Sequence, residues 1–321
     1  MTKLSDNAPV NDDLPTFPEL ESWLPLMKLA ILEDLGAEGV AGDVTSRLTI
    51  PDDVVGTAAL VQKSPGVTCG LPAVGAICQL LDERLHVEWP DVPLGEGTFK
   101  EAASRHPEEL LQITGPVRSI LAAERLILNL LGHLGGIATF TRQFARRCDG
   151  TRARIYDTRK TRPGFRSLDK YAVRCGGGFN HRVGLHDMVL VKDNHLALAG
   201  VSKGKALAKA VQELVERSRA EDATRKIEIE VDTFEQFERV LDVEGVDVIL
   251  LDNMDCPTMT RCVTIRDGSP GAARDVLLEA SGGVTLATVR DIAATGVDRI
   301  SVGAITHSAP ALDVSLDVDA A

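Results

Sequence analysis

Six short apolar runs recur through the second half of the sequence, and each ends in charged, polar or glycine residues. The runs are RIYDTRK, MVLVKDN, KIEIEVD, DVILLDN, VLLEASGG and DRISVGA, with carboxyl ends at Asp157, Lys192, Glu230, Asp252, Ser281 and Gly303. Successive ends are 35, 38, 22, 29 and 22 residues apart, and these lengths suit strand–helix–strand units. The repeat therefore favours an α/β fold with a parallel sheet.

At least three of the connecting segments have helical periodicity. Their apolar stripes are Leu207, Val211, Leu214 and Val215; Phe234, Phe237, Val240 and Leu241; and Leu286, Val289 and Ile292. Six such units favour a parallel α/β barrel, whose reactive groups gather at the carboxyl ends of the strands. An open doubly wound sheet is the alternative, although no G-x-G-x-x-G follows a strand and no G-x-x-x-x-G-K-[ST] occurs.

The first half of the chain has a different organisation. Residues 1–22 are polar and proline-rich, as in a disordered or loosely ordered tail. Residues 24–115 combine one amphipathic segment with short strand-like runs, which indicates a compact α+β domain. Residues 117–147 predict helices hinged near Gly132 and Gly135-Gly136, and we expect the domain boundary there.

Composition narrows the class of protein. Of 321 residues, 44% are hydrophobic and 26% charged, which is typical of a soluble globular protein, and no signal peptide or membrane span is evident, so we expect a cytoplasmic protein without a membrane partner. The net charge of −12 argues against nucleic acid as a partner. The six cysteines have no C-x-x-C spacing, so we expect reduced thiols and no zinc site.

One segment opposes this acidic background. Residues 157–195 contain eight Lys or Arg against four Asp, a local charge of +4. Asp157-Thr158-Arg159-Lys160 ends the first strand, where an Arg fork can bind a carboxylate and a Lys can bind a phosphate. Gly176-Gly177-Gly178 then permits close backbone approach, ahead of Asn180-His181-Arg182. The segment predicts a pocket for a small, multiply anionic ligand, with a solvated basic loop as the alternative.

Charged groups also end the next strands. Lys192 follows four apolar residues and is expected at the barrel mouth; an ion pair with Asp193 and a Schiff-base lysine are the alternatives. Glu228, Glu230 and Asp232 alternate with apolar residues on one strand face. Glu230 and Asp252 suit sugar hydroxyls, a divalent cation or a developing positive charge, or else they balance the nearby cations.

The last two strands end in small residues. Ser281-Gly282-Gly283 and Val302-Gly303-Ala304 resemble a barrel phosphate site, in which backbone N–H groups hold an anion. His307 is close enough in sequence to contribute, or it packs or caps a helix. Together these residues predict cations for two anionic groups, carboxylates between them and a phosphate site lined by glycine.

In these motifs the sequence resembles the quinolinate phosphoribosyltransferases (nicotinate-nucleotide pyrophosphorylase, carboxylating). The resemblance covers residues 30–318 and rests on DTRKT-PG, KYAVRCGGG-NHR-GL, KDNH, E-EVD, ILLDN, E-SGG and VGA-THS, in that order. It implies an N-terminal α/β sandwich domain, 23–136 plus 308–321, and an incomplete α/β barrel, 137–307. It also implies cytoplasmic NAD biosynthesis by a homodimer with shared active sites, and leaves a hexamer open.

The resemblance also implies roles for individual residues. Quinolinate would contact Arg159, His181, Arg182 and Lys192, with Arg125 from the other subunit. Phosphoribosyl pyrophosphate would contact Thr158, Lys160, Glu230, Asp252, Ser281, Gly282, Gly283, Val302, Gly303, Ala304 and His307. The catalytic set would be Lys160, Lys192, Glu230 and Asp252. Mg²⁺ would be the cofactor, bound mainly through pyrophosphate, with Glu230 and Asp252 as candidate protein ligands.

Three departures from the family pattern lie mostly outside these positions. EDLGAEGVAGDVTS is expanded, residues 96–109 form a longer stretch, and Ile305 stands where Leu is common. Other classes remain as alternatives: a Schiff-base barrel lyase, a regulatory anion-binding module and the related transferase-like protein of molybdate uptake operons. The last would be expected to lose the dicarboxylate cations, whereas Arg125, Arg159, Arg182 and Lys192 are all present. Arg162, Arg166, Lys170 and Arg174 are interpreted as loop or interface charge.

Overall fold

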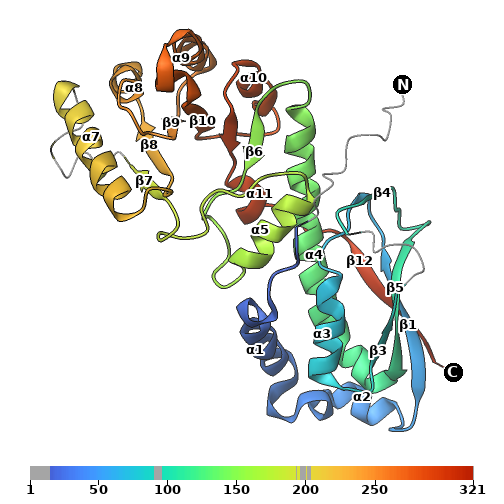
Figure 1. The fold of residues 1–321 in the computed structure, drawn as a ribbon. Coiled ribbons are helices and arrows are strands. Elements are labelled where there is room, and N and C mark those ends of the chain that lie inside the picture. The colour runs from blue at the N-terminus through green and yellow to red at the C-terminus, as the bar shows by residue number, and fades with distance from the viewer. Residues whose placement is uncertain (1–14, 90–95, 193, 196–199, 201–203, 321) are drawn as a thin grey trace. The chain divides into compact units, whose positions relative to one another are not determined.

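The computed structural model describes residues 15–89, 96–192, 194–195, 200 and 204–320. The chain divides into two compact units (Figure 1). Unit 1 contains residues 1–142, 161–177 and 305–321, and unit 2 contains residues 143–160 and 178–304. The contacts thus group residues 161–177 with the N-terminal unit, whereas the predicted barrel range of 137–307 includes them.

Unit 1 is an α/β unit built on an antiparallel sheet of four strands in the order β12-β1-β5-β3. A separate pair, β2 and β4, is also antiparallel. The strands are β1 (Val55–Gln62), β2 (Gly66–Val67), β3 (His86–Glu88), β4 (Phe99–Lys100), β5 (Glu108–Pro116) and β12 (Val314–Ala320). Exposed and buried residues largely alternate along β1, so one face of this sheet lies against the core. The C-terminal strand β12 pairs with β1 at the edge of this sheet.

The helices of unit 1 cover this sheet and its flanks. They are η1 (Leu20–Ser22), α1 (Leu24–Leu35), η2 (Gly36–Gly42), α2 (Val44–Thr49), α3 (Pro72–Leu81), α4 (Val117–Arg147, whose first 26 residues belong to unit 1) and α5 (Arg166–Cys175). Of the predicted tail, residues 1–14 lie outside the described residues, and Phe17 packs edge-on against Tyr171 of α5 at 4.8 Å. The expanded acidic-glycine stretch forms the end of α1, η2 and the start of α2.

The predicted hinge near Gly132 and Gly135-Gly136 is wrong, because α4 is one continuous helix. The glycines serve a different purpose. A Cβ on Gly136 would lie 2.1 Å from the Pro310 carbonyl oxygen, and one on Gly135 would lie 2.6 Å from a Leu312 methyl group. The small residues therefore let the chain leading into β12 pass directly against α4. By length and composition α4 could cross a membrane, but 67% of its most apolar window is buried in the fold, as expected for a core helix.

Unit 2 contains a six-stranded parallel sheet that confirms all six predicted runs. Its strands are β6 (Arg154–Tyr156), β7 (Val189–Val191), β8 (Ile227–Val231), β9 (Val248–Asp252), β10 (Leu277–Ser281) and β11 (Arg299–Ser301). The helices are α7 (Gly204–Glu221), α8 (Phe234–Leu241), α9 (Cys256–Gly268) and α10 (Val289–Ala294), with η3 (Gly271–Asp275) and the start of α11 (Ala304–His307). Figure 1 shows α7, α8, α9 and α10 ranged along the outer side of the strands.

The strand order identifies an opened barrel. The order is β6-β11-β10-β9-β8-β7, so consecutive strands from β7 to β11 pair with one another, and β6 pairs with β11. A closed barrel would need β6 to pair with β7 as well, and within the described residues these two strands form no ladder. The fold is therefore the predicted incomplete parallel barrel rather than a doubly wound sheet, whose strand order reverses in the middle.

Candidate active site

The register of the parallel sheet brings the predicted strand-end residues to one edge. Asp252 of β9 lies directly beside Ser281 of β10, and Glu230 of β8 lies beside Leu250 of β9. Ser301 of β11 pairs with Tyr156 of β6. Since all six strands are parallel, the residues that follow them share the carboxyl edge of one sheet.

Asp157, directly after β6, organises the glycine-rich segment and was not among the predicted site residues. Its side chain is fully buried, and its Oδ1 accepts a 2.8 Å hydrogen bond from the His181 backbone N–H. Its own N–H donates to the Phe179 carbonyl at 3.0 Å, and the Phe179 N–H donates to Ile155 at 2.8 Å. The segment around Phe179 thus runs beside β6 and delivers His181 and Arg182 to the site.

The two predicted carboxylate-binding arginines interact. Burial lowers the pKa of Arg182, and the positive charge of Arg159 lowers it further, so the two guanidinium groups repel one another. On the same turn, Lys160 N–H donates to Thr158 Oγ1 at 3.0 Å, which fixes the backbone that carries Arg159 and Lys160. Like charges that shift one another's pKa cluster at functional sites, so Arg159 and Arg182 are candidates for binding an anionic ligand.

His181 lies between two buried carboxylates. Its Nε2 is 3.0 Å from Glu228 Oε2 and 3.4 Å from Glu279 Oε1. Its Nδ1 accepts a 2.7 Å hydrogen bond from the Arg182 backbone N–H, which places the proton of the neutral ring on Nε2. Burial alone would lower the pKa of His181, but hydrogen bonds to Glu228 and Glu279 outweigh burial and raise it to about 10. If both ring nitrogens were protonated, Nδ1 could no longer accept the hydrogen bond from the Arg182 N–H.

The two acids beneath His181 were not predicted as site residues. Both side chains are fully buried, and burial, followed by the charge of Glu279, raises the pKa of Glu228. Ser301 donates a hydrogen bond to Glu279, and the Arg299 guanidinium lies 3.7 Å from the same carboxylate. The alternation in KIEIEVD had placed Glu228 on the face of Glu230. Nothing in the sequence indicated that His181 would contact acids on both β8 and β10.

Lys192 forms its ion pair with Glu230. Its Nζ lies 3.2 Å from Glu230 Oε2, with the Lys192 side chain 47% exposed and that of Glu230 10% exposed. The alternative partner, Asp193, lies outside the described residues. The strand-end lysine and the strand-end carboxylate are therefore neighbours across β7 and β8.

The loop after β10 turns at two glycines. Gly282 and Gly283 have φ angles of +99° and +59°, in the region that favours glycine. A Cβ on Gly282 would lie 2.1 Å from Asn253 Oδ1. Asn253, with φ of 53°, donates from its backbone N–H to the Ser281 carbonyl at 2.9 Å and from Nδ2 to Asp252 Oδ2 at 2.7 Å. Asp252 and the glycine loop are thereby held together by one asparagine that sequence reasoning missed.

The remaining predicted residues divide between the units. Val302 N–H donates to the Tyr156 carbonyl at 2.9 Å and brings Gly303 and Ala304 to the end of β6. Arg125 and His307 belong to unit 1, where Arg125 pairs with Glu124 at 3.7 Å and His307 Nδ1 lies 2.6 Å from Ser308 Oγ. Arg162, interpreted as loop charge, contacts His133 Nδ1 at 3.0 Å. Lys170, interpreted as loop or interface charge, lies on α5 and is buried.

A cavity of about 740 Å³ lies at the opposite edge of the same sheet. It is lined by residues that precede the strands, including Lys226, Asp247 and Val276. Asp247 there accepts charged hydrogen bonds from Lys226 and Arg219, both at 2.7 Å. These charges neutralise one another. Because the cavity lies at the amino ends of the strands, it is separate from the candidate active site at their carboxyl ends.

An open parallel barrel whose mouth combines neighbouring guanidinium groups, a Lys–Glu pair and a left-handed glycine loop is suited to join two anionic substrates. Family models named quinolinate phosphoribosyl transferase, N-terminal domain and C-terminal domain, match residues 43–135 and 137–317. The chain therefore belongs to the quinolinate phosphoribosyltransferase family.

Individual relatives are similar to this chain over most of its length. The carboxylating nicotinate-nucleotide pyrophosphorylase of Mycobacterium leprae is 41% identical over 86% of this chain and 91% of its own. A probable enzyme of the same name from Bacillus subtilis is 39% identical over 91% and 92%. The solved nicotinate-nucleotide pyrophosphorylase of Francisella tularensis superposes with a TM-score of 0.80 at 33% identity, covering 96% of this chain and 99% of that one.

Proposed function

We infer that this chain condenses quinolinate with phosphoribosyl pyrophosphate and decarboxylates the adduct to nicotinate mononucleotide, pyrophosphate and CO₂, in the de novo synthesis of NAD. The observation that carries the inference is the convergence of cations, carboxylates and the glycine loop at the carboxyl edge of one sheet, in a member of this family. The residue roles, the metal and the assembly below are proposals.

The cationic residues at the ends of β6 and β7 are proposed to bind the pyridine dicarboxylate. Arg159 and Arg182 repel one another in the protein, and a carboxylate placed between them would relieve that repulsion. Lys192 would bind the second carboxylate after separating from Glu230. His181 would act on the site from beneath Arg182 rather than by gripping the substrate, because its Nε2 already binds Glu228 and Glu279.

Phosphoribosyl pyrophosphate is proposed to lie between β6 and β10. Lys160 and Thr158 would bind the pyrophosphate, Glu230 and Asp252 the ribose hydroxyls, and the Ser281–Gly283 and Val302–Ala304 segments the 5′-phosphate, with His307 as a further candidate. Mg²⁺ prefers carboxylate and phosphate oxygens, so Glu230 and Asp252 fit as its protein ligands. When bound, the ion would neutralise charge on the pyrophosphate.

The chemistry follows from placement. The pyridine nitrogen attacks ribose C1 as pyrophosphate leaves. The 2-carboxylate then departs as CO₂, and its bonding electron pair stays on ring C2, which takes a proton from water. Positive charge develops on the sugar, where Glu230 and Asp252 can stabilise it, while Arg159, Arg182 and Lys192 hold the ring in line for attack. No paired nucleophile and base is needed, because orientation and fixed charges supply the acceleration. A Schiff-base lyase is disfavoured, since Lys192 faces a carboxylate rather than the apolar pocket that activates such lysines.

The proposed assembly is a homodimer in the cytoplasm, with each site completed by Arg125 of the other subunit, and with a hexamer as the larger alternative. Two observations support a second copy as the partner. The Arg125 side chain is 63% exposed, and Leu29, Leu32 and Leu48 are 59%, 54% and 77% exposed. Leucines exposed to this extent are typical of a surface that another subunit covers.

The reaction can be tested directly. Purified protein supplied with quinolinate, phosphoribosyl pyrophosphate and Mg²⁺ is expected to release CO₂ and pyrophosphate in equal amounts with nicotinate mononucleotide. Nicotinate in place of quinolinate is the control, since it lacks the carboxylate that leaves. Failure to release CO₂ at saturating substrates would sink the assignment.

A further inference from the structure

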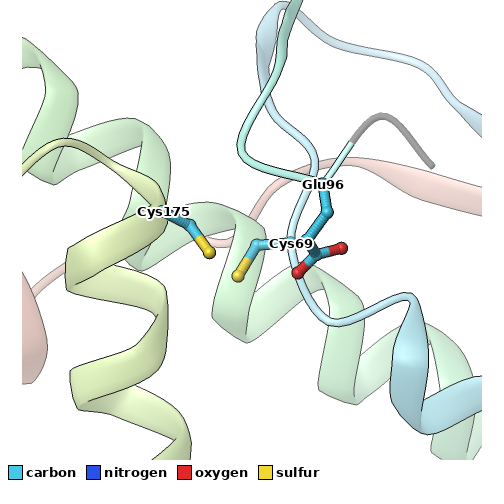
Figure 2. A group of neighbouring side chains, drawn as sticks. All are labelled: Cys69, Glu96 and Cys175. Carbon is cyan, nitrogen blue, oxygen red and sulfur yellow. The ribbon is translucent and has the colours of Figure 1, made fainter. Parts of the chain in front are cut away.

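Two thiols and a carboxylate that are distant in sequence lie together inside unit 1. Cys69 follows β2, Glu96 precedes β4 and Cys175 is the last residue of α5. Figure 2 shows the two sulfur atoms pointing toward one another, with the Glu96 carboxylate beside Cys69. The two Sγ atoms and a Glu96 oxygen all lie within 4.8 Å of one another.

The cluster is almost fully buried. Cys69, Glu96 and Cys175 are only 2%, 7% and 5% exposed. Burial, the neighbouring Cys175 thiol and the charge of the Glu96 carboxylate raise the pKa of Cys69 well above its ordinary value.

The carboxylate is fixed in orientation by neutral donors. Glu96 Oε1 accepts hydrogen bonds from Gly70 N–H at 2.6 Å and from the Tyr171 hydroxyl at 2.8 Å, and Oε2 accepts from Leu71 N–H at 3.2 Å. Burial raises the pKa of Glu96, as expected for a carboxylate whose contacts in the described residues are neutral. A cation at this position would offset that cost.

We propose that Cys69, Cys175 and Glu96 form a binding site for a thiophilic divalent cation, with zinc as the best match. Zinc takes thiolate sulfur and carboxylate oxygen in a tetrahedral shell, whose ligand atoms are about 3.5–3.8 Å apart. The cluster needs to contract by only about 1 Å to reach those separations. The Tyr171 hydroxyl, on the same carboxylate, is a candidate oxygen donor for the fourth position, with water as the other.

The exchange balances in charge. Two thiol protons leave as the divalent ion enters and forms two metal–sulfur bonds, so the net charge of the buried site is unchanged. A Cys69–Cys175 disulfide is the rival outcome. It would require loss of two electrons to an oxidant and approach of the sulfurs to about 2.05 Å, and it would give Glu96 no role.

The ion would join three separate segments of unit 1. It would tie the loop between β2 and α3 to the segment before β4 and to the end of α5. Cys175 directly precedes Gly176-Gly177-Gly178, the run that leads along the chain to His181 and Arg182. The metal is thus expected to support folding rather than to take part in phosphoribosyl transfer, and its test does not depend on activity.

Cadmium titration of the reduced, metal-free full-length chain provides that test, because bound cadmium gives a sulfur-to-metal charge-transfer band in the ultraviolet. We expect one cadmium ion per chain, displaced by zinc. Since two protons leave, the affinity should fall about 100-fold for each unit that the pH is lowered below the thiol pKa values.

Variants locate the ligands. Cys69→Ala and Cys175→Ala should each weaken binding by more than about 100-fold, since even outer partners of a metal are worth 10–100-fold. Glu96→Gln should weaken binding but retain the band. Cys148→Ala is the matched control, because Cys148 is also 5% exposed and lies outside the cluster. A wild-type chain without the band, a band that survives both cysteine variants, or a Cys69–Cys175 disulfide formed by diamide without any cadmium binding would each overturn the proposal.

Discussion

The Lys192 ammonium lies 3.2 Å from Glu230 Oε2, across the neighbouring strands β7 and β8. The two residues are proposed to serve different substrates, Lys192 the dicarboxylate and Glu230 the ribose. Each neutralises the other in the structure, so binding of one substrate would release a group for the second. The pair is therefore the point at which the two halves of the site are linked.

Substitution of each partner should separate the two halves kinetically. Lys192→Ala is expected to raise KM for quinolinate, and Glu230→Gln is expected to raise KM for phosphoribosyl pyrophosphate. Each effect should be about 10- to 100-fold, the range for losing one hydrogen bond to a charged group. Steady-state kinetics with each substrate varied in turn would measure both. Lys209→Ala, at an 80% exposed position on α7, is the control for loss of a lysine. Identical effects on both substrates from both variants would contradict the division.

The paired arginines should select for two carboxylates. Arg182→Lys keeps the charge but removes the planar fork that can bind a carboxylate through two parallel hydrogen bonds. Wild-type enzyme is therefore expected to bind phthalate much more tightly than benzoate, and Arg182→Lys should reduce that preference by about 10-fold. Competitive inhibition constants for the two compounds provide the measurement. An unchanged ratio would show that Arg182 does not contact the second carboxylate.

Periodic features of the sequence predicted the fold well. The spacing of RIYDTRK through DRISVGA predicted the six strands, and motif resemblance predicted that the barrel is incomplete. Contacts that depend on side chains from distant segments were not accessible. The sequence predicted a hinge at the glycines of α4. Their actual cause, the close approach of Pro310 and Leu312, leaves no pattern in the neighbouring sequence.

The site shows the same division. Arg159, Lys192, Glu230 and Asp252 follow apolar runs, and strand ends can be read from a sequence. Glu228 and Glu279 both contact His181, which belongs to a different segment. Only the tertiary structure reveals that these three side chains meet. The cysteines illustrate the point most directly: they have no C-x-x-C spacing, yet the fold brings Cys69, Glu96 and Cys175 within 4.8 Å of one another.

The glycine loop after β10 should not tolerate a side chain. In Gly282→Ala the new Cβ meets Asn253 Oδ1 at 2.1 Å, and φ is +99°. We expect a loss of about 1–3 kcal/mol in the free energy of unfolding, from backbone strain and the clash. KM for phosphoribosyl pyrophosphate should also rise, because the loop N–H groups move. Urea unfolding and kinetics would report the two effects. Gly268→Ala is the control, since its Cβ would meet nothing within 4 Å.

A shared active site predicts complementation between impaired subunits. Assayed well below the wild-type KM for quinolinate, pure Arg125→Ala and pure Lys192→Ala should each lose about 10- to 100-fold in rate. Mixed dimers should recover activity, because one of the two sites in each hybrid then contains both residues. Differently tagged subunits, co-expressed and purified through both tags, would supply the hybrids. Confirmed hybrids without activity would mean that Arg125 does not reach the neighbouring site.

The cluster of His181 with Glu228 and Glu279 should make stability depend on alkaline pH. The pKa of His181 is raised to about 10 in the folded protein, against about 6.5 when unfolded. The folded state therefore binds this proton more tightly, so the contribution to stability is complete below about pH 6.5 and is lost as the pH rises toward 10. Between pH 7 and 10 the free energy of unfolding of the wild-type protein should fall by on the order of a few kcal/mol, a loss that His181→Gln does not show.

Urea unfolding across this range would measure the difference, with His86→Gln, at an exposed position on β3, as the control. Parallel curves for wild type and His181→Gln would mean that the proton is not held between the two acids.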